Sequence, residues 1–101
     1  MPVAYVVVES KITDVEAFKK YMAAAPAVVK AFGGEYMVRG GRLEVLEGTW
    51  QPPRMTVLRY PSFETAKAMY DSPAYVAVRK LRVGATAVFN MVLVEGVEAP
   101  V

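Results

Sequence analysis

The stretch VAYVVVE, residues Val3–Glu9, decides the fold together with the helical pattern that follows it. β-Branched and aromatic residues dominate this stretch, which predicts a central strand of a sheet. Thr13 and Glu16 then have the spacing of a capping box, so a helix is expected to begin there. Apolar residues recur along it at three- and four-residue steps, at Val15, Phe18, Met22, Ala25, Val29 and Phe32. Pro26 is expected to kink or break this helix, and Gly33-Gly34 to end it.

The region after this helix contains two short strand-like segments around a glycine pair. Glu35–Arg39 and Leu43–Glu47 flank Gly40-Gly41, which predicts either a small hairpin or one long strand with a glycine bulge. Trp50–Pro53 is expected to form a loop. The remaining pattern predicts a strand, two helices begun by serine caps, and a final strand, at Arg54–Tyr60, Phe63–Tyr70, Ala74–Arg82 and Ala87–Glu95.

The order of these elements is typical of the ferredoxin-like βαββαβ plan, an α+β fold with an antiparallel sheet and its helices on one face. The 101 residues suit one domain, assigned to residues 1–96, with residues 97–101 as a C-terminal tail. The helix-free face of the sheet carries Val, Tyr, Met and Leu rather than charges. Because that face needs cover and 54% of the residues are hydrophobic, we expect a homodimer with its two sheets face to face, a dimeric α/β barrel.

The residue types that the chain lacks exclude several kinds of chemistry. Without Cys and His it has no thiolate nucleophile, no Ser-His-Asp triad and no usual zinc or haem ligand. We therefore expect no metal and no cofactor, with haem held by Tyr or a carboxylate as an alternative. The net charge of +2, with Lys and Arg interspersed among acids, does not fit nucleic-acid binding. There is no apolar run of about 18 residues and no signal peptide, so we expect no membrane partner and a cytoplasmic location.

Arginine side chains are the main candidates for ligand binding, because a guanidinium offers a planar pair of donors to a carboxylate or phosphate. The five candidates are Arg39, Arg42, Arg54, Arg79 and Arg82. The alternative is that each forms a surface ion pair with an acid such as Glu44, Glu47 or Asp71. Trp50 could form a wall of a ligand pocket or pack against the core or a partner subunit. The predicted ligand-binding set is Arg39, Trp50, Arg54, Tyr70 and Arg79.

Acid–base catalysis has three candidate residues, Glu47, Asp71 and Tyr70. A carboxylate works as a base near neutral pH only where burial raises its pKa, and the alternative is that both acids are solvated. Phenols could donate to a substrate oxygen or serve packing alone, at Tyr36, Tyr60, Tyr70 and Tyr75. Pro2 would offer a tautomerase-like amine at the start of a strand, but Met1 precedes it and blocks that amine.

Several short motifs together are typical of one known family. They are Arg39-Gly40-Gly41, Leu46-Glu47-Gly48, Trp50 with Pro53-Arg54, Tyr60-Pro61-Ser62, and Ser72-Pro73 with Tyr75. From Tyr5 to Gly96 the chain resembles the DUF1330 family, which implies a dimeric α/β barrel. Relatives in that superfamily include cofactor-independent monooxygenases, muconolactone isomerases and haem enzymes. Family members often carry Glu where Ala74 stands, so this chain lacks one carboxylate, and any activity transfers by analogy of fold alone.

The function expected from these features is binding of a small anionic or enolisable organic molecule in a pocket between helices and sheet, with or without cofactor-free catalysis. The first alternative is a structural or interaction homodimer, and the second is a tautomerase that uses Pro2. A cavity of roughly 300 Å³ or more with two unpaired arginines would favour binding, whereas ion-paired arginines would favour the structural role.

Overall fold

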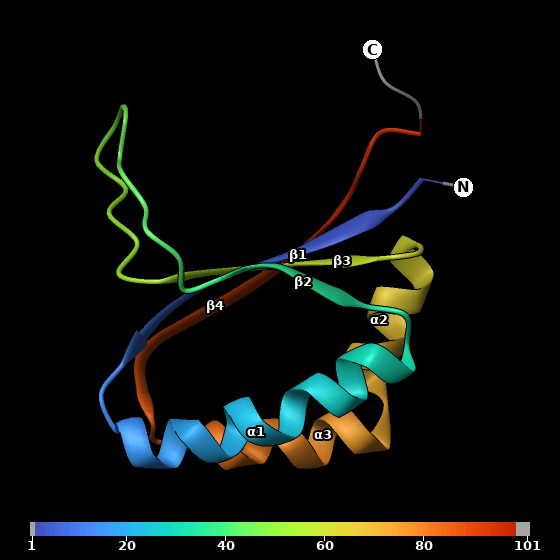
Figure 1. The fold of residues 1–101 in the computed structure, drawn as a ribbon, viewed down its shortest axis with the longest axis horizontal. Helices are drawn as coiled ribbons and strands as arrows, with labels where there is room; N and C mark the ends of the chain where they lie inside the picture. Colours follow the sequence, from blue (N-terminus) through green and yellow to red (C-terminus); the bar gives the residue numbers. More distant parts are fainter. Residues whose placement is uncertain (1, 99–101) are drawn as a thin grey trace.

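A four-stranded antiparallel sheet carries all the helices on one face in the computed structural model, which describes residues 2–98 (Figure 1). The elements are β1 Ala4–Ile12, α1 Val15–Ala31, β2 Glu35–Arg39, β3 Met55–Tyr60, α2 Phe63–Asp71, α3 Pro73–Arg79, the 3₁₀ turn η1 Lys80–Arg82 and β4 Thr86–Glu95. The strand order is β2-β3-β1-β4. This arrangement confirms the predicted ferredoxin-like α+β fold. Met1 and residues 99–101 of the expected tail lie outside the described residues.

Strand β1 is central because its two faces both carry apolar side chains. Val6 and Val8 point to the helices and are buried, while the alternate residues point to the other side. The buried cluster between sheet and helices combines these valines with Leu58 and Tyr60 from β3 and with residues of each helix, namely Val29, Ala66, Met69 and Tyr75. The sheet therefore has a packed face and a face without helices.

The face without helices is apolar at its centre. Val7 pairs with Val57 of β3 and with Val92 of β4, so three valines lie side by side. Val92 and Val94 are 59% and 48% exposed. The segment 40–54 rises on this same side of the sheet, opposite to the helices (Figure 1). This side therefore offers the surface on which the dimer prediction depends.

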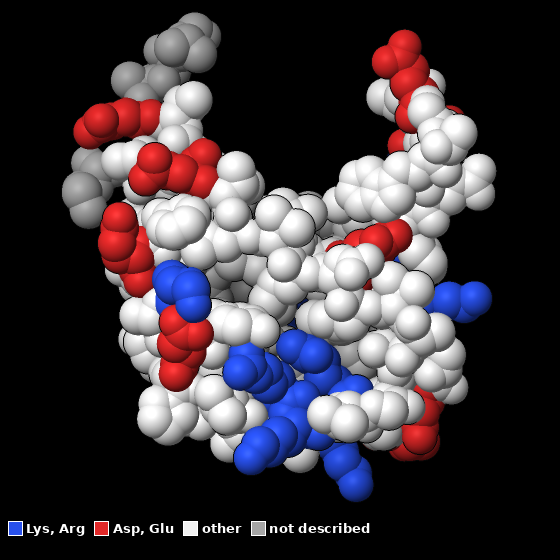
Figure 2. Space-filling view, turned by 180° about the vertical axis from the view of Figure 1, so that it is seen from behind, with Lys and Arg blue, Asp and Glu red and all other residues white. Residues whose placement is uncertain are grey.

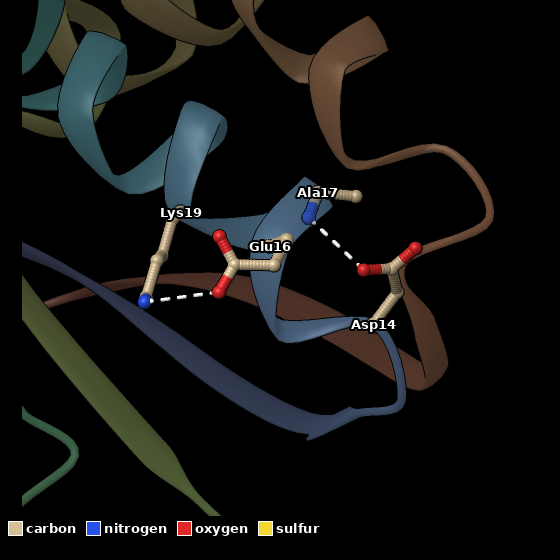
Figure 3. Close-up of polar contacts among 4 residues, drawn as sticks. All are labelled: Asp14, Glu16, Ala17 and Lys19. Carbon is tan, nitrogen blue, oxygen red and sulfur yellow. Dashed lines mark hydrogen bonds and ion pairs between the residues drawn. The ribbon is translucent and has the colours of Figure 1, made fainter.

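Helix α1 begins one residue later than the capping-box prediction. Asp14 is the N-cap, and its Oδ1 accepts a hydrogen bond of 3.1 Å from the Ala17 N–H (Figure 3). Glu16 instead forms an exposed ion pair with Lys19. The N–H groups of Thr13 and Asp14 both bond the Ala85 carbonyl, at 2.9 and 3.1 Å, which ties the start of the helix to the loop before β4.

Helix α1 continues through Pro26, so the predicted break does not occur. A proline at this position has no N–H to donate to the carbonyl of Met22, four residues earlier. That carbonyl accepts instead a hydrogen bond of 2.8 Å from Arg39 Nη2 on β2. The side chain of a neighbouring strand thus replaces the missing helical bond.

The segment 40–54, hereafter the arm, is irregular, so the prediction of a second strand at Leu43–Glu47 is wrong. The alternating pattern there has no neighbouring strand to pair with, and its apolar side chains Leu43, Val45 and Leu46 are exposed. Two contacts fix the ends of the arm. The Gly40 N–H bonds the Met55 carbonyl at 2.8 Å, and Trp50 Nε1 donates to Glu9 Oε2 at 3.0 Å.

The helix expected over Ala74–Arg82 is shorter than predicted. Ser72 caps it as expected, accepting from the Tyr75 N–H at 3.1 Å, but α3 ends at Arg79 and the chain tightens into η1. The final turn precedes Gly84, whose φ of +79° turns the chain toward β4.

Candidate functional site

A cavity of about 40 Å³ lies between α1 and the helix-covered face of the sheet. Side chains from both layers and from α3 line it. Those with polar groups are Tyr21, Tyr36, Arg39, Arg54, Thr56, Tyr60 and Tyr75. A buried water molecule needs a cavity volume of about 10–15 Å³. The cavity therefore has room for roughly three waters or for a group such as a carboxylate.

Arg39 closes the cavity at the edge of β2. Its guanidinium bonds the Met22 carbonyl that Pro26 leaves free, and it lies 4.5 Å from the centroid of the Tyr36 ring. Arg39 is exposed, so the cavity reaches solvent at this end. The position of the guanidinium therefore depends on a proline in a different element.

Arg54 lies beside Arg39, just before β3. Its Nη1 donates to Thr56 Oγ1 at 3.2 Å. Gly40 makes room for it, because a Cβ at that glycine would lie 2.7 Å from Arg54 Nε, and the φ of Gly40 is +70°. Burial, and then the positive charge of Arg39, lower the pKa of Arg54. Neither guanidinium has a carboxylate partner among residues 2–98, so their mutual repulsion is not offset.

Tyrosine hydroxyls supply neutral hydrogen-bonding groups inside the cavity. Tyr60 is 1% exposed and its hydroxyl has no hydrogen-bond partner in the described structure. The hydroxyls of Tyr21 and Tyr75 lie 2.6 Å apart. Burial raises the pKa of Tyr21, Tyr36 and Tyr60, so these phenols stay protonated at neutral pH. A buried donor without an acceptor favours a ligand that brings one.

The arrangement can bind an anionic oxygen but offers it no carboxylate base. Two guanidiniums and protonated phenols can stabilise a carboxylate or an enolate. No Asp or Glu is among the described residues that line the cavity. Glu47 is exposed in the arm, and Asp71 pairs with Lys67 at the end of α2. The carboxylates predicted as candidate bases therefore lie elsewhere.

The structure divides the predicted ligand-binding set. Arg39 and Arg54 come together, but Trp50, Tyr70 and Arg79 do not line this cavity. Trp50 is held by Glu9 on the other side of the sheet. Arg79 lies 4.3 Å from the Tyr70 ring centroid at the opposite edge of the sheet.

The other sequence candidates also lie outside the cavity. Arg42 is exposed in the arm, and Arg82 stacks at 3.7 Å on Phe89. Pro2 precedes β1 and is not among the lining residues. Sequence analysis also missed Tyr21 and Thr56. Tyr21 directly follows a pair of lysines, which suggests an exposed position. Only its spacing of three residues from Phe18 indicates that it lies on the buried face of the helix.

Among residues 2–98, no three acids lie close enough together to hold a metal ion. The same part of the chain contains no helix that combines the length and the hydropathy needed to cross a bilayer.

The fold and the cavity together define an α+β ferredoxin-like domain with arginines and tyrosines between its helices and its sheet. The model of the family described as Domain of unknown function (DUF1330) matches residues 3–97, and the chain belongs to this family. No curated protein matches the chain in sequence.

Solved structures share this fold at low sequence identity. A protein of unknown function from Rhodopseudomonas palustris is 17% identical, with a TM-score of 0.77 over 97% of this chain and 85% of that chain. A dimeric ferredoxin-like protein of unknown function from Bacteroides fragilis is 15% identical, with a TM-score of 0.61 over 93% and 96%. A candidate antibiotic biosynthesis monooxygenase from Nitrosomonas europaea is 14% identical, with a TM-score of 0.57 over 95% and 91%. These likenesses show the fold alone.

Proposed function

We propose that this protein binds a small organic anion, a carboxylate or an enolate, in the cavity between α1 and the sheet. The observation that carries the proposal is the placement of Arg39 and Arg54 at one cavity without a carboxylate partner among the described residues. The unpartnered hydroxyl of Tyr60 adds a neutral donor. An anion there would offset the repulsion between the guanidiniums and accept the free phenolic hydrogen.

The size of the cavity limits what enters it. A volume of about 40 Å³ is below the roughly 300 Å³ expected for a whole small-molecule site. The charged head of the ligand would therefore occupy the cavity, and the rest of the molecule would extend past Arg39 to solvent. Because no carboxylate base lines the cavity, the geometry supports binding of an existing anion better than abstraction of a proton.

A titration with pyruvate, acetoacetate and benzoate tests this proposal, with acetamide and benzamide as neutral counterparts. We expect the acids to bind and the amides not to bind. Arg39→Ala and Arg54→Ala should each weaken binding by more than about 1.5 kcal/mol, the low end for hydrogen bonds to charged groups.

The matched control is Arg42→Ala, which removes the same charge from the exposed arm and should leave affinity unchanged. Equal binding by the parent protein, Arg39→Ala and Arg54→Ala would contradict the proposal. Native mass spectrometry of protein purified gently from its own source would then report whether any bound molecule accompanies the chain.

We also propose that two copies of the chain pair through the face without helices. The support is the exposed valine row around Val92 and the dimeric state of the Bacteroides fragilis protein that shares the fold. Pairing would cover apolar surface that the single chain leaves in contact with water.

A further inference from the structure

A second, larger hollow lies between α2 and the edge strand β4. It has a volume of about 270 Å³, near the lower end of the roughly 300–1,000 Å³ typical of ligand sites. Its lining is apolar except for Lys67 and Tyr70. Lys67 is already paired with Asp71. This space, hereafter the α2–β4 hollow, therefore has no unpaired charge among its described lining residues.

The α2–β4 hollow and the Arg39–Arg54 cavity share part of their lining. Val6, Met69 and Met91 contact both spaces. Met69 comes from α2 and Met91 from β4, so the side chains between the two spaces belong to both layers of the fold. A methionine side chain has three rotatable bonds and adapts its shape readily. Rotation of these two side chains would join the spaces, and the combined volume would reach the range typical of ligand sites.

The two spaces differ in chemistry. Guanidiniums and phenolic hydroxyls line the Arg39–Arg54 cavity, while the α2–β4 hollow offers mainly alkyl and thioether surface. β4 is the edge strand at the back of Figure 1, so Figure 2 faces this edge of the sheet. In that view Lys and Arg side chains gather in the lower centre, and the surface above them is largely uncharged (Figure 2). The hollow therefore suits the uncharged part of a molecule whose charge lies elsewhere.

We propose that the two spaces form one site for an amphipathic monocarboxylate, with its head at Arg39 and Arg54 and its alkyl chain in the α2–β4 hollow. This inference rests on the function proposed above and specifies the class of ligand. A polar body extends past Arg39 to solvent. An alkyl chain instead passes between Met69 and Met91, because leaving water increases affinity by up to about fourfold for each CH₂ group that is fully buried.

The first test compares sodium butanoate with sodium octanoate by calorimetric titration of the full chain. We expect octanoate to bind more tightly than butanoate by about tenfold or more, because its four additional CH₂ groups leave water. 1-Octanol has the same chain without the charge, so it should bind about tenfold more weakly than octanoate or worse.

NMR of labelled methyl groups locates each part of the ligand and needs no variant. Both acids should shift Met22, which lines only the Arg39–Arg54 cavity. Octanoate alone should also shift Ala66 and Leu93, which line only the α2–β4 hollow.

Variants test the two halves of the site separately. Leu93→Trp fills the α2–β4 hollow and should reduce the affinity for octanoate to about that for butanoate. The matched control is Leu46→Trp, the same substitution at a leucine that is 85% exposed in the arm, which should leave both affinities unchanged. Arg39→Ala should weaken both acids by the same factor, because both place their heads there. Thermal unfolding checks that each variant folds.

Four results would overturn the inference, and they separate it from the proposed function. Butanoate binding without a gain for octanoate would remove the alkyl site and leave the anion site intact. Octanoate shifts at Met22 without shifts at Leu93, or equal octanoate affinity in Leu93→Trp and Leu46→Trp, would do the same. Octanoate binding that survives Arg39→Ala would place the head elsewhere. Absence of binding by both acids would overturn the proposed function together with this inference.

Discussion

At the scale of the residue, the cavity is shaped by side chains whose roles depend on residues far away in sequence. Gly40 is required by the approach of Arg54, and the carbonyl that holds Arg39 is available because residue 26 is proline. Sequence analysis named Arg39 and Arg54 because they flank the glycine pair and the Trp50 loop, and the structure brings both to one cavity. It could not show that Arg79 lies at a different edge of the sheet from Arg39, because the distance between these two arginines depends on how α3 packs.

Tyr60→Phe should make the protein less sensitive to alkaline pH. Burial raises the pKa of Tyr60 in the folded state, so above about pH 10 the unfolded chain loses this proton first. The free energy of unfolding then falls as pH rises, by up to about 1.4 kcal/mol per pH unit for one phenol. Urea unfolding at pH 8 and pH 11 should show the variant gaining about 1 kcal/mol relative to the parent between the two conditions.

At pH 8 the two proteins should differ little, because the hydroxyl that is removed has no partner to lose. A parent protein as stable at pH 11 as the variant would contradict the role assigned to the buried phenol.

At the scale of the element, the residue patterns predicted most of the helices and strands. The elements that were predicted wrongly have physical causes. Helix α2 was predicted to within one residue, and the central strand was predicted at Val3–Glu9 but extends three residues further, to Ile12. The arm was mistaken for a strand because alternation alone does not supply a pairing partner. The start of α1 was placed one residue early because Thr13 and Asp14 are both good N-cap residues and the sequence alone does not choose between them.

Asp14→Ala should destabilise the protein by about 1 kcal/mol, the usual effect of removing an N-cap side chain. Thr13→Ala should have almost no effect, because the observed bond of Thr13 uses its backbone N–H. Chemical denaturation of the two variants under the same conditions measures both values. A larger loss in Thr13→Ala than in Asp14→Ala would restore the capping-box assignment.

At the scale of the whole molecule, the single chain leaves an apolar sheet face and the apolar side chains of the arm exposed on the same side (Figure 1). Glu9 lies on that face and connects them, since it accepts from Trp50 Nε1 at 3.0 Å and from Asn90 Nδ2 at 2.9 Å. A partner subunit on the valine row would therefore also meet the base of the arm.

Val92→Lys should convert a dimer into a monomer without unfolding the chain. The side chain is 59% exposed in the single chain, so a lysine there meets water in a monomer but would be buried, unpaired, between two sheets. Light scattering coupled to size exclusion gives the mass, and circular dichroism checks the fold. A variant that keeps the mass of the parent dimer would contradict pairing through this face.

The bond from Arg39 to the Met22 carbonyl has an evolutionary consequence. Any residue other than proline at position 26 restores a helical N–H that competes for that carbonyl. An arginine at position 39 then loses the hydrogen bond to this carbonyl, and its contact with the Tyr36 ring remains. Among family members, positions 26 and 39 are therefore expected to vary together, with proline accompanying arginine and both lost in the same branches.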